Sequence, residues 1–490
     1  MLRKVLIANR GEIACRIIRT LRQERIEAVA VYHHEDRHAP HVSMADVALE
    51  LEGDVPTAAY LDQAQIIDIA RRTGADAIHP GYGFLSENAG FAERVENSGI
   101  LFIGPSAAAI RLMGDKIRAR EFASKQGVPV APSAVQDGSL EQFAEHAARV
   151  GFPLLIKAAS GGGGKGMRIV HEAAALADSV REAAGEAQRY FGDGRVYAER
   201  YIERPRHIEV QILGDGGGNV VHLYERECSI QRRYQKIIEE SPAPNLADET
   251  REAMCAAAVR LASAARYRNA GTIEFVLAPE GEFYFLEMNT RLQVEHPVTE
   301  QVLGIDLVRE QLRIGAGGGL SFTQGDLRPR GHAIECRICA EEPEQGFRPA
   351  TGRVGVLRIP RGANVRFDAG IRAGQPVTPA FDSLLAKLVV WNPTRVGAAA
   401  TLERALTDLV ILGVPTNVDY LARVIRHPEF LAGRLHTGFL TDHVAELAAP
   451  DASQEAEAVV AIAAALADAD FRRAAFAVPE PYASIGKWCN

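Results

Sequence analysis

Short runs of branched apolar residues alternate with helical patterns over about the first 110 residues of the chain. The pattern predicts strands over residues 4–8, 28–32, 77–79 and 99–103, and helices over residues 13–23 and 60–72. Strands that are separated by helices in this way form βαβ units, in which the strands lie parallel. The N-terminal part is therefore predicted to be a Rossmann-like parallel α/β domain.

The pattern changes after this domain, and α+β organisation is expected for the rest. Residues 208–288 have the pattern of long strands, with one helix predicted over about 251–267. The glycine run at 315–319 is a plausible joint, because glycine-rich segments commonly mark breaks between periodic segments. A further strand-rich unit runs from about residue 331 to 439, and a helix is predicted over 456–470 in the alanine-rich tail.

Composition narrows the class of protein. The 490 residues are 47% apolar and 24% charged, which is typical of a globular chain. The net charge of −8 gives no support for a nucleic-acid partner, and no apolar run approaches the roughly 18 residues that a membrane span requires. Six cysteines form no disulfide framework, and the first residues enter a strand at once and leave no room for a leader peptide. We therefore expect a cytoplasmic protein.

A glycine-rich loop follows a predicted strand at residues 154–158. The loop begins after Ser160, and it contains Lys165, while Lys157 lies on the strand. It is not a Walker A loop, because Lys165 is followed by Gly-Met instead of Ser or Thr. A flexible surface loop is the alternative. The two lysines favour a loop that closes on phosphate groups.

Two predicted strands, residues 272–277 and 283–288, form a hairpin around a turn. If Leu277 lies opposite Tyr284, then Glu274 lies opposite Glu287. Cross-strand Cβ atoms are about 5 Å apart, so two carboxylates there repel each other by about 3 kcal/mol at an effective dielectric of 20. A cation is expected between them, and Mg²⁺ bound with substrate phosphates fits this site.

Polar residues continue at every second position after the hairpin. They are Glu287, Asn289, Arg291, Gln293 and Glu295. On an extended chain all five lie on one face. A solvated strand face is the alternative, but a mixture of acids, amides and a guanidinium beside an apolar partner strand favours a metal and anion site.

Several segments together resemble the biotin carboxylase family, the ATP-grasp component of biotin-dependent carboxylases. The most informative is Glu287-Met-Asn-Thr-Arg-Leu-Gln-Val-Glu-His-Pro297. The others are residues 7–13, 79–88, 113–116, the glycine loop with its preceding lysine, 206–211, 227–236 and 335–337. Their order along the chain is that of the family, and the resemblance covers residues 1 to about 439.

The resemblance implies a role for each of these positions. The residues implied to bind ATP are Lys116, Lys157, Gly163, Gly164, Met167, Glu199, Arg200, Tyr201, Ile202, His207, Gln231, Tyr234, Glu274 and Glu287. The implied Mg²⁺ (or Mn²⁺) ligands are Glu274, Glu287 and Asn289. The implied bicarbonate site is Lys236, Arg291, Gln293 and Val294, with Glu295 as general base and Arg337 beside the biotin ureido oxygen. In such a site bicarbonate attacks the γ-phosphate to give carboxyphosphate, which then carboxylates biotin.

The family likeness also implies an ATP-grasp architecture. The expected boundaries are 1–113 for the N-terminal domain, 114–330 for the ATP-grasp domain with a lid at about 131–203, 331–444 for the C-terminal domain, and 445–490 for a helical tail. No Ala-Met-Lys-Met biotinylation signature occurs. A biotinyl carrier and a carboxyltransferase are therefore expected from another chain or a missing part, and a homodimer is implied. The rival functions are those of another ATP-grasp ligase that forms an acyl phosphate and of a catalytically silent ATP-binding subunit.

Some positions depart from the family or invite other interpretations. Tyr234 replaces a usual His, Arg200 a usual Lys, and Cys339 a usual Asn. Cys336 and Cys339 have the Cys-x-x-Cys spacing of a zinc site, but there is no second pair, and small buried side chains are expected. The four histidines between residues 33 and 41 are expected in a solvated loop. Arg16 and Arg366 are expected as surface charges by default, and the alternative implied by the resemblance is a place in the dimer interface, which in the family uses residues from these regions.

Overall fold

The computed structural model describes residues 2–136, 138–159, 167–449, 459–466 and 468. Met1–Leu447 form one compact unit, and Ala448–Asn490 form a second. In the second unit, residues 459–466 are helical, which confirms the central part of the predicted tail helix, and its ends lie outside the described residues. Glycines 163 and 164 also lie outside them.

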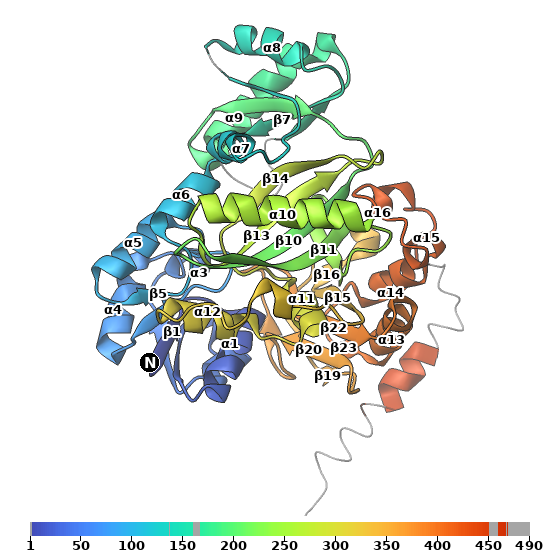
Figure 1. Ribbon diagram of the computed structural model, residues 1–490. Helices are drawn as coiled ribbons and strands as arrows, with labels where there is room; N and C mark the ends of the chain where they lie inside the picture. The colour runs from blue at the N-terminus through green and yellow to red at the C-terminus, as the bar shows by residue number, and fades with distance from the viewer. Residues whose placement is uncertain (1, 137, 160–166, 450–458, 467, 469–490) are drawn as a thin grey trace, which may run out of the picture. The chain divides into compact units, whose positions relative to one another are not determined.

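The N-terminal part is a parallel sheet, as predicted (Figure 1). Its strand order is β3 (Val47–Leu51), β2 (Glu27–His33), β1 (Lys4–Ile7), β4 (Ala77–His79) and β5 (Leu101–Phe102). Its helices are α1 (Gly11–Gln23), α2 (Pro40–Met44), α3 (Pro56–Ala59), α4 (Gln63–Thr73), α5 (Ala89–Asn97) and α6 (Ala107–Gly114). The sequence analysis missed the edge strand β3, whose residues alternate Val47, Leu49 and Leu51.

An eight-stranded antiparallel sheet forms the centre of the molecule. Its order is β14 (Phe283–Asn289), β13 (Arg268–Leu277), β10 (Arg206–Asp215), β11 (Val220–Arg232), β12 (Gln235–Ser241), β15 (His332–Cys339), β22 (Leu384–Asn392) and β20 (Val365–Ala369). The pairing of β12 with β15 continues the sheet across the boundary that the sequence predicts at 330/331. Side chains from both sides of that boundary therefore meet on one sheet.

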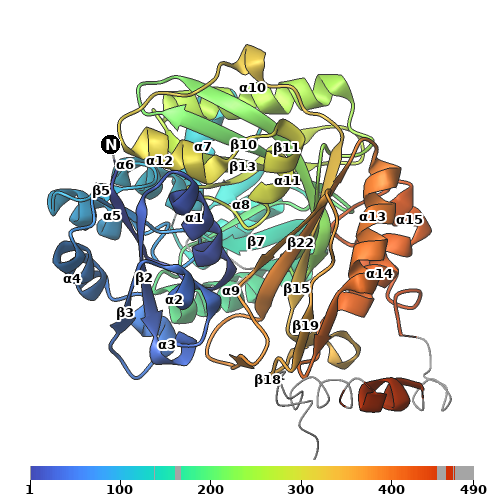
Figure 2. The ribbon, with the colours of Figure 1, turned by 90° about the horizontal axis from the view of Figure 1, so that it is seen from below.

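Helices cover both faces of this sheet. Its first half packs against α6, α7 (Lys116–Lys125) and α10 (Asp248–Ala264), the last of which confirms the helix predicted there. On its second half, Ile334, Cys336 and Ile338 of β15 face α13 (Arg395–Asp408) and α14 (Val418–Arg426), which lie along one side of β15 and β22 in Figure 2. The alternate residues of β15 face α11 (His296–Leu303), where Ala333 contacts the cluster that contains Val298.

The segment predicted as the lid contains a small sheet of its own (top of Figure 1). Its order is β6 (Ser133–Val135), β9 (Val196–Arg200), β7 (Leu154–Ala158) and β8 (Arg168–Val170), with α8 (Leu140–Ala148) and α9 (Leu176–Phe191) packed on it. The backbone N–H of Phe285 donates to the carbonyl of Pro129 at 2.7 Å, which ties the start of this segment to β14.

Short elements complete the described chain. They are α12 (Leu307–Gly315), α15 (Pro428–Leu431), α16 (Phe439–Asp442) and three two-stranded pairs, β16 (Glu341–Glu342) with β17 (Arg348–Pro349), β18 (Gly352–Arg353) with β21 (Pro376–Val377), and β19 (Val356–Arg358) with β23 (Val410–Leu412). Within the described ranges, every helix is too short or too polar to cross a lipid bilayer.

Candidate active site

The β13–β14 hairpin places two carboxylates side by side. Glu274 lies directly opposite Glu287, as predicted. The premise of that prediction is wrong near the turn, because Leu277 pairs with Phe283 and not with Tyr284. A β-bulge adds one residue to β14 between Phe285 and Glu287 and restores the register at the acids.

Glu274 is buried and surrounded by donors. Lys236 Nζ lies 2.8 Å from its Oε1, and His207 Nε2 lies 3.0 Å from its Oε2. The side-chain amides of Asn289 and Gln293 each donate to Oε1 at 2.9 Å. Burial alone would raise the pKa of Glu274, but Lys236 and His207 hold it well below the usual value. Glu274 is therefore ionised at neutral pH.

Lys236 of β12 joins three carboxylates. Its Nζ contacts Glu209, Glu274 at 2.8 Å and Glu295 at 2.6 Å. Burial lowers its pKa, but the three acids outweigh burial and raise the value well above normal. Arg226, which is fully buried, donates its Nε to Glu209 at 2.5 Å and its Nη2 to Gln293 at 2.8 Å. The cluster is thus a network of alternating charges.

The sequence analysis missed Glu209 and Arg226. Glu209 lies on β10 directly opposite Glu274, so three acids lie in a row across β10, β13 and β14. The alternation of His207, Glu209 and Gln211 along β10 is the signal that could have identified it. Arg226 had no local signal, because its role depends on the register of β10 with β11.

Glu295 and Arg337 form the second part of the site. Arg337 Nη2 on β15 lies 3.1 Å from Glu295 Oε2, while Lys236 holds Glu295 Oε1. Burial would raise the pKa of Glu295, and Lys236, Arg337 and Arg226 instead lower it strongly. The carboxylate is ionised and accepts hydrogen bonds from two cations.

The predicted extended face holds only as far as Asn289, where β14 ends. The chain then turns into α11, so the prediction of five residues on one strand face is wrong beyond that point. Gln293 nevertheless reaches Glu274, and Arg291 turns to Glu87, with its Nε 2.8 Å from that carboxylate, and to Asn289 Oδ1 at 3.1 Å. The carbonyl of Val294 accepts from Lys387 at 2.7 Å.

Two lysines lie at the predicted phosphate site, Lys116 on α7 and Lys157 on β7 of the lid. Lys116 Nζ lies 3.0 Å from Glu287, and Lys157 Nζ lies 2.5 Å from Glu199 on β9. Arg120 holds the other oxygen of Glu199 at 2.7 Å. The Glu199 carboxylate is thus engaged by two cations, Lys157 and Arg120.

The remaining predicted nucleotide residues differ in position. Arg200 ends β9 with its side chain exposed, Tyr201 and Ile202 follow half-buried, and Met167 lies half-buried just before β8. Gln231 donates to His207 Nδ1 at 2.9 Å, next to Glu274. Tyr234 lies with Arg233 on the β11–β12 turn, both at positive φ (65° and 50°), and its side chain is 53% exposed.

The donor set on the hairpin fits Mg²⁺. Glu274, Glu287 and Asn289 offer hard oxygen atoms on neighbouring strand positions, the donors that Mg²⁺ prefers. Lys116 contacts Glu287 at 3.0 Å and supplies a cationic group beside them for phosphate groups.

The predictions for the histidines and for the cysteine pair are wrong in one part and confirmed in the others. His33 and His41 are buried and not in a solvated loop, while His34 and His38 are exposed as expected. Cys336 and Cys339 are both buried, as expected for small core side chains.

Arg16 and Arg366 are not ordinary surface charges. Arg16 is buried and donates to Glu300 at 2.7 Å and to Asp306 at 2.8 Å. Arg366 donates to the other oxygen of Glu300 at 2.7 Å and also pairs with Asp368. The default prediction fails because these arginines fix α1, α11 and β20 to one another through shared carboxylates.

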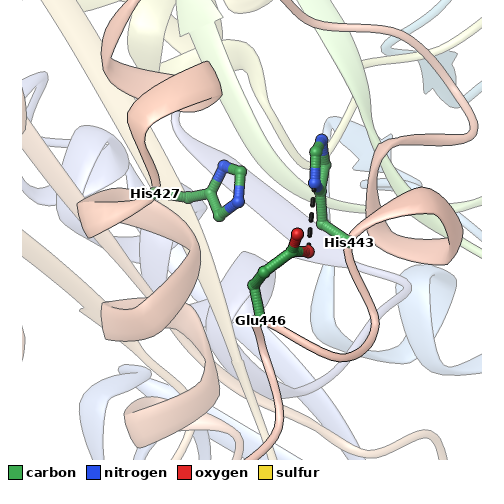
Figure 3. A group of neighbouring side chains, drawn as sticks. All are labelled: His427, His443 and Glu446. Carbon is green, nitrogen blue, oxygen red and sulfur yellow. Dashed lines mark hydrogen bonds and ion pairs between the residues drawn. The ribbon is translucent and has the colours of Figure 1, made fainter.

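A separate group of titratable side chains lies near the end of the compact unit. His427, His443 and Glu446 face one another, with His443 Nδ1 3.2 Å from Glu446 (Figure 3). His427 Nδ1 accepts the backbone N–H of Glu429, which caps α15. The proton of the neutral His427 ring is then on Nε2, which makes that nitrogen a donor and not a metal ligand. Hydrogen bonding accounts for this group.

Three family models match the chain. They are "Biotin carboxylase, N-terminal domain" over residues 1–110, "Carbamoyl-phosphate synthase L chain, ATP binding domain" over 115–323, and "Biotin carboxylase C-terminal domain" over 335–442.

Curated relatives match nearly the whole chain. The biotin carboxylase of Nostoc is 49% identical over 440 residues, which are 90% of this chain and 98% of that protein. The chloroplastic biotin carboxylase of Arabidopsis thaliana is 47% identical over 91% of this chain and 83% of that protein. The alpha chain of mitochondrial methylcrotonoyl-CoA carboxylase from Dictyostelium discoideum is 45% identical over 99% of this chain and 70% of that one.

Solved structures share the fold. The biotin carboxylase domain dimer of Hydrogenobacter thermophilus 2-oxoglutarate carboxylase, in complex with MgADP, ADP and bicarbonate, has a TM-score of 0.89 and 43% identity, and covers 92% of this chain and 100% of that one. A biotin carboxylase complex with β-γ-ATP from Campylobacter jejuni has a TM-score of 0.87 and 42% identity, with coverage of 90% and 99%. The predicted fold class, an ATP-grasp enzyme with α/β and α+β parts, is confirmed.

Proposed function

Since the chain belongs to the biotin carboxylase family, we propose that it carboxylates biotin with bicarbonate in a reaction driven by ATP. The observation that carries this proposal is the cluster in which Lys236 holds Glu274 and Glu295, and Glu295 also contacts Arg337. The cluster combines an acid for a nucleotide-bound cation, a proton acceptor and two cations for an anionic substrate. Such a combination fits the attack of bicarbonate on a phosphoryl group.

The nucleotide is bound between the central sheet and the lid in this proposal. Lys116 and Lys157 hold its phosphates together with the glycine loop at 163–164, and Glu274, Glu287 and Asn289 ligate Mg²⁺. The bound ion would offset the charge that develops on the transferred phosphoryl group. The residues proposed to contact the base and ribose are Met167, Glu199, Arg200, Tyr201, Ile202, His207, Gln231 and Tyr234.

Bicarbonate is bound beside these groups by Lys236, Arg291, Gln293 and the backbone of Val294. Glu295 takes the bicarbonate proton, and the oxygen so activated attacks the γ-phosphorus to give carboxyphosphate and ADP. In the structure Glu295 is a weak base, because Lys236 and Arg337 both stabilise its anion and lower its pKa. An anionic substrate that takes hydrogen bonds from the same cations would raise its basicity at the moment of use.

Arg337 stabilises biotin at the final step. Carboxyphosphate breaks into CO₂ and phosphate next to the ureido group, and the phosphate removes the ureido proton. The guanidinium holds the resulting oxygen anion through a planar, permanently charged fork while the ureido nitrogen attacks CO₂ to form the N–C bond of carboxybiotin. Closure of the lid, which carries the glycine loop, would exclude water, which would otherwise hydrolyse the intermediate.

The proposed reaction also indicates which partner proteins the chain needs. We infer that a biotinylated carrier and a carboxyltransferase lie outside the given chain and that two copies form a homodimer. The Hydrogenobacter domain dimer and the names of the methylcrotonoyl-CoA carboxylase relatives support this inference. The chain spans 61% of the alpha chain of the soybean methylcrotonoyl-CoA carboxylase, so that relative has further sequence beyond the shared region.

The test is ADP release in the presence of bicarbonate and free biotin. The wild-type chain should release ADP at a rate that rises with the concentration of each, while Glu295→Gln and Arg337→Ala should each lower this rate at least about 100-fold and still fold, as a cooperative melting transition shows. Arg337→Ala should melt at a lower temperature, because Glu239 and Glu295 lose a buried partner. Glu282→Gln, at an exposed acid of the hairpin turn, is the control that should keep full activity. ADP release that depends on neither bicarbonate nor biotin would instead favour another ATP-grasp ligase, and no turnover at all would favour a catalytically silent protein.

A further inference from the structure

Two buried carboxylates that take no part in the reaction above lie next to Arg337. Glu239 of β12 and Glu335 of β15 are direct cross-strand partners, and both side chains are fully buried. Glu335 and Arg337 are two residues apart on β15, so they share the face that packs toward α11. The sequence analysis assigned neither acid a role.

Glu239 makes the shorter contacts to the guanidinium. Its Oε1 accepts from Arg337 Nε at 2.6 Å and lies 2.5 Å from Nη2, whereas Glu295 is 3.1 Å from the same Nη2. Both contacts are made by one oxygen, so Glu239 anchors the Nε/Nη2 edge of the guanidinium through charge-assisted hydrogen bonding. Arg337 Nη1 donates to no atom of the described chain, so the opposite edge of the fork is free to face a substrate.

The other oxygen of Glu239 and the carboxyl group of Glu335 have unused hydrogen-bonding capacity. Glu239 Oε2 and both Glu335 oxygens are buried and have no hydrogen-bond partner in the described chain. Cross-strand Cβ atoms are about 5 Å apart, which is within reach of a carboxyl–carboxylate hydrogen bond. Two ionised acids at that distance in a dry interior would repel each other, and one shared proton removes the repulsion. Burial raises the pKa of Glu335 well above normal, against the charge of Lys387, and the neighbouring Glu239 adds to the rise. Burial also raises the pKa of Glu239, but Arg337 limits the rise to about 7, so Glu335 is the acid that keeps the proton.

We propose that Glu239 is the positioning residue of Arg337 and that Glu335 is a neutral carboxylic acid that donates its proton to Glu239. Glu239 contacts no substrate in this arrangement and acts only through Arg337. It holds the Nε/Nη2 edge of the guanidinium in place while Glu295 accepts the bicarbonate proton. The inference rests on the proposed function, since it assumes that the guanidinium of Arg337 binds biotin.

The same substitution at the two acids should have opposite results. Glu239→Gln removes the charge that orients Arg337 and should lower kcat/KM for free biotin by about 10- to 100-fold, the range for a lost charge-assisted hydrogen bond. The KM for ATP should not change, because Lys116 and Lys157 are untouched. Glu335→Gln replaces a neutral acid by a neutral amide of the same shape, which can still donate to Glu239, so kcat/KM for biotin should stay within about twofold of wild type.

Glu239→Asp distinguishes the effect of losing the charge from the effect of disturbing the structure. It keeps a carboxylate beside Arg337 and should recover part of the activity that Glu239→Gln loses, whereas a purely structural role would make both substitutions equally harmful. Melting temperatures are measured for all three variants.

The outcomes distinguish this inference from the proposed function. Wild-type protein without biotin-dependent ADP release would refute both. An active wild type with an equally active Glu239→Gln variant would overturn the positioning role alone, and so would a rise in the KM for ATP as large as the loss in kcat/KM for biotin. A loss in Glu335→Gln as large as that in Glu239→Gln would overturn the neutral acid.

Discussion

Replacement of Lys236 by methionine tests whether the cluster is held together by charge. Methionine has nearly the length of lysine but no ammonium group, so Glu209, Glu274 and Glu295 lose their common counter-ion. These three carboxylates are at most 5% exposed, so water cannot replace the lost contacts. Removal of one partner from a buried ion pair costs about 3–5 kcal/mol.

The remaining partners of the three carboxylates decide where in this range the loss of stability falls. Arg226 still holds Glu209, and His207 and Arg337 still contact Glu274 and Glu295. Each carboxylate keeps one partner, so we expect the lower end, about 3 kcal/mol in the free energy of unfolding at pH 7. Biotin-dependent ADP release should be lost as well.

The pH dependence has a defined sign. In the wild type, Lys236 lowers the pKa of Glu274 and Glu295, so their contribution to stability is present above the usual carboxyl pKa and lost as the pH falls through the lowered value. In the variant, burial without Lys236 raises the pKa of both carboxyl groups. As the pH falls, these groups bind protons and the variant becomes less destabilised. The difference in the free energy of unfolding between wild type and variant should therefore be smaller at pH 5 than at pH 7.

The assay is urea unfolding at both pH values, with Lys125→Met as control. Lys125 is exposed at the end of α7, and its loss should change the free energy of unfolding by less than about 0.5 kcal/mol. A Lys236→Met variant as stable as the wild type at pH 7, or a difference that widens at pH 5, would refute the assignment of Lys236 as the counter-ion of three acids.

Three further changes test other parts of the molecule. Glu287→Gln should raise the Mg²⁺ concentration for half-maximal ADP release about tenfold or more, because a neutral amide is a weaker ligand; an unchanged Mg²⁺ titration would remove it from the metal site. Arg16→Ala should lower the free energy of unfolding in urea by about 3 kcal/mol, because the buried Glu300 carboxylate loses one of its two arginine partners. A loss below about 1 kcal/mol would show that Arg366 alone is enough to stabilise Glu300. Glu87→Gln should raise the KM for bicarbonate a few-fold, because the exposed pair with Arg291 at 2.8 Å is broken, and steady-state kinetics with an unchanged KM would contradict this positioning.

The hairpin acids are the part of the site that the sequence predicted best. A period of two along each strand and a short turn fix which side chains face each other, and both signals are local. The bulge in β14 shows the limit of these local signals. The predicted register was wrong by one residue next to the turn, while the predicted pair Glu274–Glu287 was correct. Beyond Asn289 the period of two gave a wrong prediction of a strand face, since the chain leaves the sheet there.

Contacts between distant strands were decided only by the tertiary structure. Glu239 and Arg337 are 98 positions apart and meet because β12 pairs with β15. No local pattern specifies which strands of a sheet become neighbours, since that choice depends on how helices such as α11 and α13 cover its two faces. The sequence alone therefore determined the chemical groups and their order along each strand. Packing decided which charges are buried together, and with that the ionisation of Glu295 and the partners of Arg337, because burial and long-range pairing are properties of the whole fold.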